Sequence, residues 1–151
     1  MYTDYFEKFG YIFEIVCDDF YLLKLKTTDK KGEIIPNALT DKVKKQLSQY
    51  FSGERKIFDI PVFFNGTDFQ SKVWNELLNI PYGETRSYFD IAKAIGNEKA
   101  SRAVGNANNK NPIWIIVPCH RVIGKNGKLA GYGGGIKLKE ILLNIEKIGK
   151  A

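Results

Sequence analysis

The chain has 151 residues, of which 44% are hydrophobic and 13% aromatic, so it has enough apolar surface to build a core and is not expected to be disordered throughout. Its formal net charge of +6 lies wholly in residues 67–151, which carry thirteen basic and seven acidic side chains, whereas residues 1–66 carry ten of each. A basic part beside a neutral one favours a polyanionic partner, although solubility alone explains such a charge equally well.

No run approaches the roughly 18 apolar residues of a membrane span. The N-terminus carries Asp4 and Glu7 and lacks the profile of a signal peptide, so we expect a cytoplasmic protein without membrane association. The chain has only two cysteines, Cys17 and Cys119, and one histidine, His120, which are too few for a Cys/His zinc tetrahedron. We therefore expect no metal and no cofactor.

The first 66 residues are expected to form an α/β domain. Around position 24, apolar residues alternate with lysines, as in a strand with one buried face. Between positions 39 and 51, apolar residues recur at the spacing of a helix. The predicted elements are two strands, a helix and a third strand: Tyr11 to Val16, Tyr21 to Lys26, Leu39 to Phe51, and Ile57 to Phe64. This ββαβ-like unit is expected to end at the turn-forming pair Asn65-Gly66.

The remainder of the chain is expected to be mainly helical. Thr67 and Gln70 match a capping box, in which two side chains satisfy each other's backbone donors at the start of a helix. A helix, a turn and a second helix are predicted next: Tyr88 to Ile95, Gly96-Asn97, and Glu98 to about Asn108. This is the pattern of a DNA-binding helix-turn-helix, although many helical hairpins share it.

The second helix of this pair is expected to have one buried and one open face. The inward positions are Ala100, Ala103, Val104 and Ala107. The opposite face carries Arg102, Gly105, Asn106 and Asn109. The apolar run Ile113 to Val117 then leads to Pro118-Cys119-His120-Arg121, and a last amphipathic helix is predicted from Leu138 to Ile148.

Cys119 stands directly beside the only histidine, His120. A thiolate is the nucleophilic form of cysteine, and a nearby imidazole favours its formation, directly or through a water. Adjacent residues need not face each other, however. By itself the pair fits a buried, inert cysteine beside a surface histidine at least as well as a reactive site.

The surrounding residues strongly resemble the active-site region of the O6-alkylguanine-DNA alkyltransferases, also called methylated-DNA–protein-cysteine methyltransferases. The matching positions are Tyr88, Arg102-Ala103-Val104-Gly105, Asn111-Pro112, Pro118-Cys119-His120-Arg121-Val122, Gly131-Tyr132 with the following glycines, and Glu146. The resemblance covers residues 67–151, and over residues 1–66 it rests on the domain arrangement alone. It implies a ribonuclease-H-like ββαβ domain (1–66) and a mainly α, winged-helix-like domain with a helix-turn-helix (67–151).

The resemblance also implies a role for each residue of the reaction centre. Cys119 would be the alkyl acceptor, and His120 would activate it through a water. Glu146 would orient His120, following the logic of a catalytic triad. Tyr88 would donate a proton to guanine N3, and Asn111 would tie the helix-turn-helix to the acceptor segment. The plainer alternative for Glu146 is a surface ion pair with Lys150, one helical turn later.

The implied partner is double-stranded DNA, bound through the minor groove with little sequence preference, by a protein expected to be a monomer. Arg102 would enter the base stack in place of a nucleotide flipped out for repair. Positions expected to contact DNA or to shape the guanine pocket are Gln70, Asn97, Gly105, Lys125, Tyr132, Gly133 and Trp114. The transfer from O6-alkylguanine, and from O4-alkylthymine, would be irreversible, because a thioether is not hydrolysed under mild conditions.

Two features depart from the pattern. Gly133 stands where some relatives carry a serine, so a hydroxyl toward O6 is lost. Trp114 stands where some relatives carry smaller residues, and we expect it to narrow the pocket against benzyl adducts. Two other classes of function stay open: binding of the lesion without chemistry, as in alkyltransferase-like proteins, and a Cys-His hydrolase or transcription factor. Cys17 is expected to be a buried strand thiol.

Overall fold

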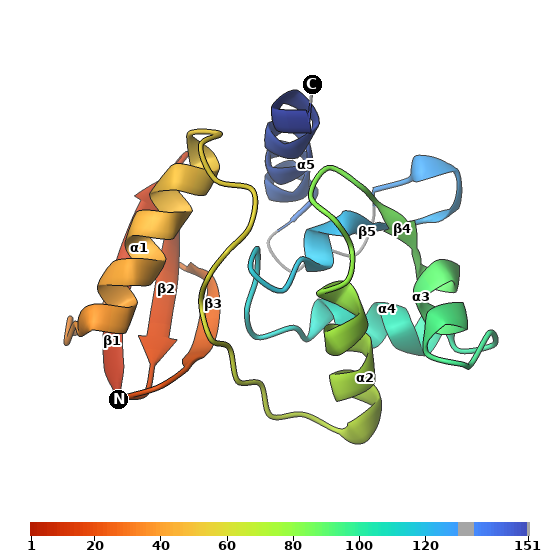
Figure 1. The fold of residues 1–151 in the computed structure, drawn as a ribbon, viewed down its shortest axis with the longest axis horizontal. Coiled ribbons are helices and arrows are strands. Elements are labelled where there is room, and N and C mark those ends of the chain that lie inside the picture. The colour runs from red at the N-terminus through yellow and green to blue at the C-terminus, as the bar shows by residue number, and fades with distance from the viewer. Residues whose placement is uncertain (130–134, 151) are drawn as a thin grey trace. The chain divides into compact units, whose positions relative to one another are not determined.

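The computed structural model describes residues 1–129 and 135–150, apart from the side chains of residues 126, 148 and 150. The chain divides into two compact units, Met1–Phe64 and Asn65–Ala151. The division falls beside Asn65-Gly66, where the sequence changes from an α/β pattern to a helical one. Figure 1 shows the elements of each unit in chain order.

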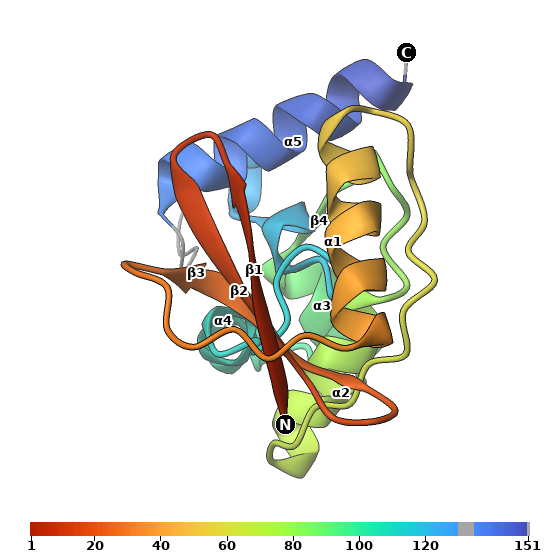
Figure 2. The ribbon, with the colours of Figure 1, turned by 90° about the vertical axis from the view of Figure 1, so that its left-hand side faces the viewer.

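The N-terminal unit is a three-stranded antiparallel sheet with one helix. Its elements are β1 (Tyr2–Lys8), β2 (Tyr11–Cys17), β3 (Leu22–Thr28) and α1 (Ala38–Phe51). Neighbouring strands pair in the order β1-β2-β3. Figure 2 shows α1 lying along the sheet, which it contacts at β1 and β2. Phe13 and Ile15 from the sheet and Val43 and Leu47 from the helix are fully buried and form the core between the two layers.

Two of the strands and the helix of this unit confirm the sequence prediction, and one predicted strand is wrong. Residues 57–64 form no strand; Val62 alone makes an isolated parallel bridge with Leu22. Pro61 interrupts the segment because it has no N–H to donate, and Ile57 and Phe63 are more than half exposed. The first strand, β1, was not predicted. The element order is therefore βββα, in place of the expected ββαβ.

The C-terminal unit begins with the predicted helices. They are α2 (Asp68–Leu77), α3 (Tyr88–Ala94) and α4 (Ser101–Asn109). The capping box at Thr67 and Gln70 is present, and the turn between α3 and α4 contains Gly96 at φ +83°, a conformation that favours glycine. Helix α4 starts three residues later than predicted. Trp74 of α2 is buried and its Nε1 donates to the Ala107 carbonyl of α4 at 2.8 Å, which joins α2 to the helix pair.

The inward face of α4 differs from the predicted one at two positions. Ala103 is exposed, whereas Asn108 is buried beside Val104 and Ala107. Positions 104, 107 and 108 follow the i, i+3, i+4 spacing of a buried helical stripe, and position 103 lies off that stripe. Arg102, Asn106 and Asn109 lie on the exposed side, as predicted.

The rest of the C-terminal unit consists of short elements followed by a long helix. They are β4 (Arg86–Ser87), η1 (Cys119–Arg121), β5 (Val122–Ile123), η2 (Lys125–Gly127) and α5 (Ile136–Lys150). Strands β4 and β5 pair in parallel. Because α3 follows β4 directly and η1 precedes β5 directly, this pairing joins the entry of α3 to the turn that carries Cys119. Over the described residues, no helix combines the length and the apolar character needed to cross a membrane.

We predict that Thr67→Ala lowers the free energy of unfolding of the C-terminal unit by about 1 kcal/mol, because the cap of α2 loses its side-chain acceptor. Both tryptophans, Trp74 and Trp114, belong to this unit, so urea unfolding followed by tryptophan fluorescence measures its stability. Thr67→Ser keeps the hydroxyl and is the matched control. Equal stability of the alanine and serine variants would contradict the prediction.

Candidate active site

Cys119 is the first residue of the 3₁₀ turn η1 and is only 2% exposed. It follows a tight, buried turn formed by residues 113–117, where Ile115 adopts φ +71°. A β-branched residue at positive φ is strained, so the surrounding packing must hold this turn in place. The Asn108 side chain of α4 donates from Nδ2 to the Cys119 carbonyl at 3.3 Å. The turn that carries Cys119 is therefore bonded directly to α4.

Asn111 is fully buried and holds the turn that delivers Cys119. Its Nδ2 donates to the carbonyls of Ile113 and Val117 at 3.0 and 2.8 Å, and its Oδ1 accepts from the Ile113 N–H at 3.0 Å. Trp114 is 7% exposed, and its Nε1 donates to the Asn111 carbonyl at 3.0 Å. The Asn111 side chain therefore links the segment after α4 to the turn that precedes Cys119.

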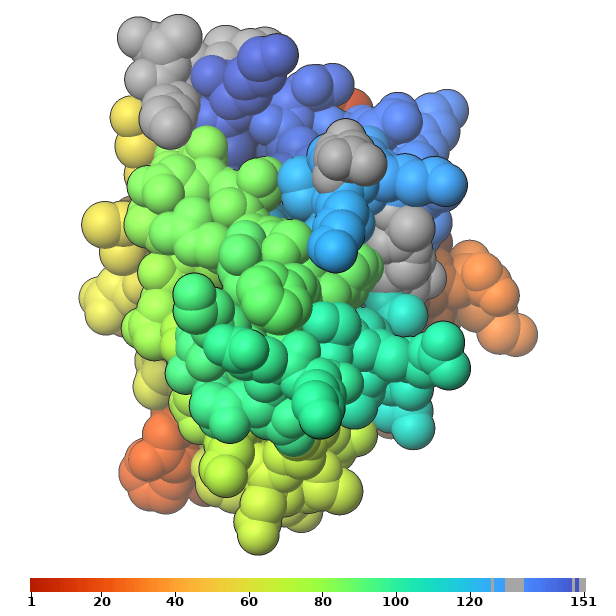
Figure 3. Space-filling model, turned by 90° about the vertical axis from the view of Figure 1, so that its right-hand side faces the viewer, coloured from red at the N-terminus to blue at the C-terminus, as the bar shows by residue number. Residues whose placement is uncertain are grey.

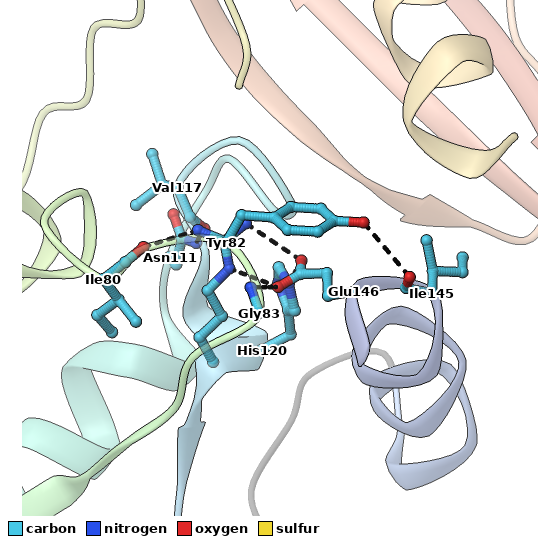
Figure 4. Close-up of polar contacts among 9 residues, drawn as sticks. Ile80, Tyr82, Gly83, Asn111, Val117, His120, Ile145 and Glu146 are labelled. Atoms are coloured by element: carbon cyan, nitrogen blue, oxygen red, sulfur yellow. Dashed lines mark hydrogen bonds and ion pairs between the residues drawn. The ribbon is translucent and has the colours of Figure 1, made fainter. Parts of the chain in front are cut away.

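His120 and Glu146 form a buried pair. Figure 4 shows the Glu146 carboxylate, on α5, directed at the His120 ring, and Nε2 and Oε2 lie 2.5 Å apart. Their side chains are 0% and 1% exposed. The two alternatives that placed His120 and Glu146 at the surface are therefore wrong. An ionised carboxylate only accepts hydrogen bonds, so the ring carries its hydrogen on Nε2. Nδ1 is buried, with no hydrogen-bond partner among the described residues, and is left as a proton acceptor.

Arg121 shares the same carboxylate, a role that the sequence did not suggest. Its Nε donates to Glu146 Oε1 at 2.8 Å and its Nη2 to Oε2 at 3.2 Å, while Nη1 donates to the Ile80 carbonyl at 2.8 Å. The Gly83 N–H also donates to Oε1 at 3.2 Å. These contacts of the described residues bring four nitrogen atoms to the Glu146 carboxylate, three of them from His120 and Arg121.

The charges of this cluster follow from its contacts. Burial alone would raise the pKa of Glu146, but the hydrogen bonds from His120 and Arg121 and the positive charge of Arg121 outweigh it and hold the pKa well below the usual value. Burial lowers the pKa of His120, and the positive charges of Arg121 and Lys139 add to this effect against the attraction of Glu146. At neutral pH the pair is therefore an ionised carboxylate and a neutral imidazole.

Lys139 on α5 is a second buried cation that the sequence prediction missed. Its side chain is fully buried, and its Nζ donates to the Val122 carbonyl at 2.6 Å. Burial lowers its pKa to about 8, against the opposing influence of the Cys119 charge. Lys139, Leu142 and Glu146 are spaced at i, i+3 and i+7, so the signal was available as two charged residues on an apolar helical stripe.

Tyr88, the first residue of α3, lies near the acceptor. Its pKa is raised by burial and by the negative charge of Cys119, so the phenol and the sulfur are within electrostatic reach of each other. A Cβ added to Gly105 of α4 would lie 3.7 Å from Tyr88 Cε1. The Tyr88 ring therefore packs over Gly105, which brings two of the predicted site positions together.

The positions expected to contact DNA differ in their exposure. Figure 3 shows segments of α3 and α4 at the surface of one face. Arg102, Asn97 and Lys125 are exposed, whereas Gln70 is partly buried and its Oε1 accepts the Thr67 N–H in the cap of α2. Tyr132 and Gly133, which were expected to shape the guanine pocket, lie outside the described residues.

Cys17 is a core thiol, as expected. It lies in β2 with 0% exposure, and burial, together with the charge of Asp18, raises its pKa to about 12. The thiolate is therefore scarcely populated near neutral pH. Within the described ranges, 1–129 and 135–150, no three His, Cys, Asp or Glu side chains gather as a set of metal ligands.

Comparison with known proteins gives consistent matches. Residues 68–148 match the family described as 6-O-methylguanine DNA methyltransferase, DNA binding domain. The methylated-DNA–protein-cysteine methyltransferase of Methanosarcina mazei is 53% identical over 133 residues, which is 84% of this chain and 83% of that protein. The protein of the same name from Methanosarcina acetivorans is 65% identical over 102 residues, which is 68% of this chain and 65%, just under two thirds, of that protein.

The fold is also similar to that of a solved relative. The crystal structure of Mycobacterium tuberculosis OGT in complex with DNA superposes with a TM-score of 0.87 at 46% identity and covers 97% of this chain and 92% of that one. Sequence and fold agree across both units, and the match over residues 68–148 includes Cys119, His120 and Glu146. The chain belongs to the methylated-DNA–protein-cysteine methyltransferase family.

Proposed function

We propose that this protein repairs alkylated DNA by transferring the alkyl group from O6 of guanine to the sulfur of Cys119, once per molecule. The observation that carries the proposal is the buried acceptor turn. Cys119 is followed directly by a histidine whose Nε2 is fixed by Glu146 and whose Nδ1 is free to accept a proton. The name of the M. mazei relative, and the DNA bound in the M. tuberculosis structure, support the same activity and partner.

Activation of the thiol would pass through His120. Successive residues of a 3₁₀ turn point about 120° apart, so neighbouring side chains do not face each other and a bridging water suits the pair better than direct contact. The proton of Cys119 would move through that water to Nδ1. Glu146 would stabilise the imidazolium that forms, as the carboxylate does in a catalytic triad.

Transfer would be an in-line displacement at the alkyl carbon. The thiolate forms the new S–C bond while the C–O bond to guanine breaks, and the electron pair moves to the base. Tyr88 would share its proton with guanine N3, which neutralises the leaving group. A thioether is a stable product, so the protein is a stoichiometric acceptor instead of a turnover catalyst.

The DNA would be bound by the helix-turn-helix in the minor groove. Cys119 is 2% exposed, so the damaged nucleotide must leave the base stack to reach it, which costs a few kcal/mol. Arg102, exposed on α4, would fill the vacated space, and the positive charge of residues 67–151 would bind phosphates without strong sequence preference. O4-alkylthymine is the second substrate we propose, and a monomer in the cytoplasm is the form we expect to act.

The competing classes differ from this proposal in what happens to Cys119. A lesion-binding protein without chemistry needs no acceptor, and the buried His120–Glu146 pair beside the thiol would then have no use. A hydrolase would turn over on an ester or amide, and a transcription factor would prefer one operator sequence.

Incubation with DNA containing O6-methylguanine is expected to add about 14 Da, one methylene, to Cys119, as in other covalent transfers to a thiolate. Mass spectrometry of the intact protein and of its peptides measures the adduct and locates it. Cys17→Ser should react like the unmodified protein, whereas Cys119→Ser should bind the DNA without gaining mass. No mass change under saturating DNA binding would instead favour lesion recognition without chemistry.

Arg102→Ala is expected to slow transfer from duplex DNA by about tenfold or more, because the cost of extruding a nucleotide is no longer offset by the inserted side chain. Single-turnover rates with a duplex and with free O6-benzylguanine separate the two steps. The free base needs no extrusion, so its reaction should keep the original rate. An equal loss on both substrates would assign Arg102 to the chemistry and refute the insertion role.

Trp114→Ala is expected to raise the rate with O6-benzylguanine relative to O6-methylguanine by about tenfold, the usual scale of discrimination by pocket size. The ratio of the two rates is the measure, since a general loss of stability from the missing Trp114–Asn111 hydrogen bond affects both substrates equally. Trp114→Phe, which keeps an aromatic ring but not the donor, is the matched control. Identical ratios in the alanine variant and the unmodified protein would show that Trp114 does not narrow the pocket.

A further inference from the structure

The buried polar cluster of the C-terminal unit contains more positive than negative charge. Arg121, Lys139 and Glu146 are 7%, 0% and 1% exposed, so two cations and one carboxylate share a region that excludes water. Isolated charges are costly to bury, and this cluster already contains one more cation than anions. Protonation of His120 would add a second excess positive charge.

The positive charge of Arg121 affects His120 through Glu146, because both side chains bind the same carboxylate. In a simple Cys-His-carboxylate arrangement the carboxylate serves the imidazole alone. Here Arg121 donates to both Glu146 oxygens, at 2.8 and 3.2 Å, and Oε2 is the atom that also contacts His120. A carboxylate whose charge is already shared by a guanidinium stabilises an imidazolium less strongly than one that is not.

The guanidinium is held in this position from its far side. Nη1 donates to the Ile80 carbonyl at 2.8 Å, and the guanidinium lies over the Tyr82 ring at 5.8 Å from its centroid. These contacts come from the segment between α2 and β4, whereas Glu146 belongs to α5. Figure 4 draws the dashed contacts of the Ile80 carbonyl and of the Glu146 carboxylate, with Tyr82 between Ile80 and Ile145.

We propose that Arg121 is a positioning residue that keeps His120 neutral, with its hydrogen on Nε2 and with Nδ1 available to accept the proton of Cys119. Its importance for the rate rests on the proposed function, whereas the protonation state can be measured in the protein without DNA. The charged groups that act on His120 are Glu146 and Lys139 from α5 and Arg121 from η1. Cys119 is its neighbour in η1, and Tyr82 interacts electrostatically with Glu146 and Arg121. Only Arg121 both adds positive charge and competes for the carboxylate.

Loss of the Arg121 guanidinium should raise the pKa of His120 for two reasons. Removal of the guanidinium takes away a repelling charge and ends its competition for the Glu146 carboxylate, and each change favours the imidazolium. The titration of His120 should therefore move to higher pH, by about one unit or more, as is usual for the loss of a close charge. A protonated ring has a hydrogen on Nδ1 and cannot take the thiol proton.

His120 is the only histidine of the chain, so NMR of ¹⁵N-histidine-labelled protein gives one set of imidazole signals. In the unmodified protein we expect the neutral Nε2–H tautomer at pH 7 and a titration below the ordinary histidine value of about 6.5. Arg121→Gln should titrate about one unit higher or more. Arg121→Lys keeps the charge and should shift less than half as far. An Nδ1–H tautomer or a titration above the ordinary value in the unmodified protein would overturn the proposal, even if neither variant folds.

The pH dependence of single-turnover alkyl transfer provides the second measurement. The acidic limb of the profile should move to higher pH in Arg121→Gln, in parallel with the NMR titration, and stay close to that of the unmodified protein in Arg121→Lys. A purely structural role would lower the fraction of active protein and leave the limb where it is, which would refute the proposal. If the NMR shift occurs but neither protein transfers an alkyl group, the proposed function fails and the assignment of Arg121 stands.

Discussion

The rest of the C-terminal unit depends on the hydrogen bonds that the Glu146 carboxylate accepts. It accepts from the His120 imidazole, the Arg121 guanidinium and the Gly83 N–H, so it connects α5, the acceptor turn and the segment after α2 at one buried point. A buried carboxylate is stable only if its hydrogen bonds are made, and removal of one partner of such a group is far more damaging than the pair is stabilising. The position of the His120 ring and the packing of α5 therefore have the same physical origin.

The turn before Cys119 is held in a similar way, by side-chain hydrogen bonds in place of those that a helix or strand would supply. Residues 113–117 are buried but belong to no regular helix or strand, so their backbone groups need other partners. Asn111 supplies three of these hydrogen bonds, and Asn108 adds one to the Cys119 carbonyl. Asn108 lies in the last turn of α4 and Asn111 follows its C-cap, which explains how a strained turn at Ile115 can be kept in place beside this helix.

Local signals in the sequence were reliable where a short-range mechanism determines the structure. The capping box at Thr67, the glycine turn at Gly96 and the periodicity of α1 depend on neighbouring residues only. The strand predicted at residues 57–64 is absent, because strand formation depends on a partner strand that the local sequence pattern cannot reveal. At the site, the motif suggested Cys119, His120 and Glu146, but not Arg121 or Lys139, since a charged residue in a sequence is by default a solvated one. Only the fold shows that both cations are buried, Arg121 against the Glu146 carboxylate and Lys139 against the Val122 carbonyl.

The burial of Cys119 has a consequence for the life cycle of the molecule. An enzyme that turns over must open its site at every cycle, and product release often limits its rate. An acceptor that is used once keeps its product as part of its own chain, so no release step constrains how tightly the sulfur is enclosed. If Cys119 is consumed as proposed above, this protein can enclose its sulfur tightly, and the amount of repair would be limited by synthesis of new protein instead of by catalytic rate.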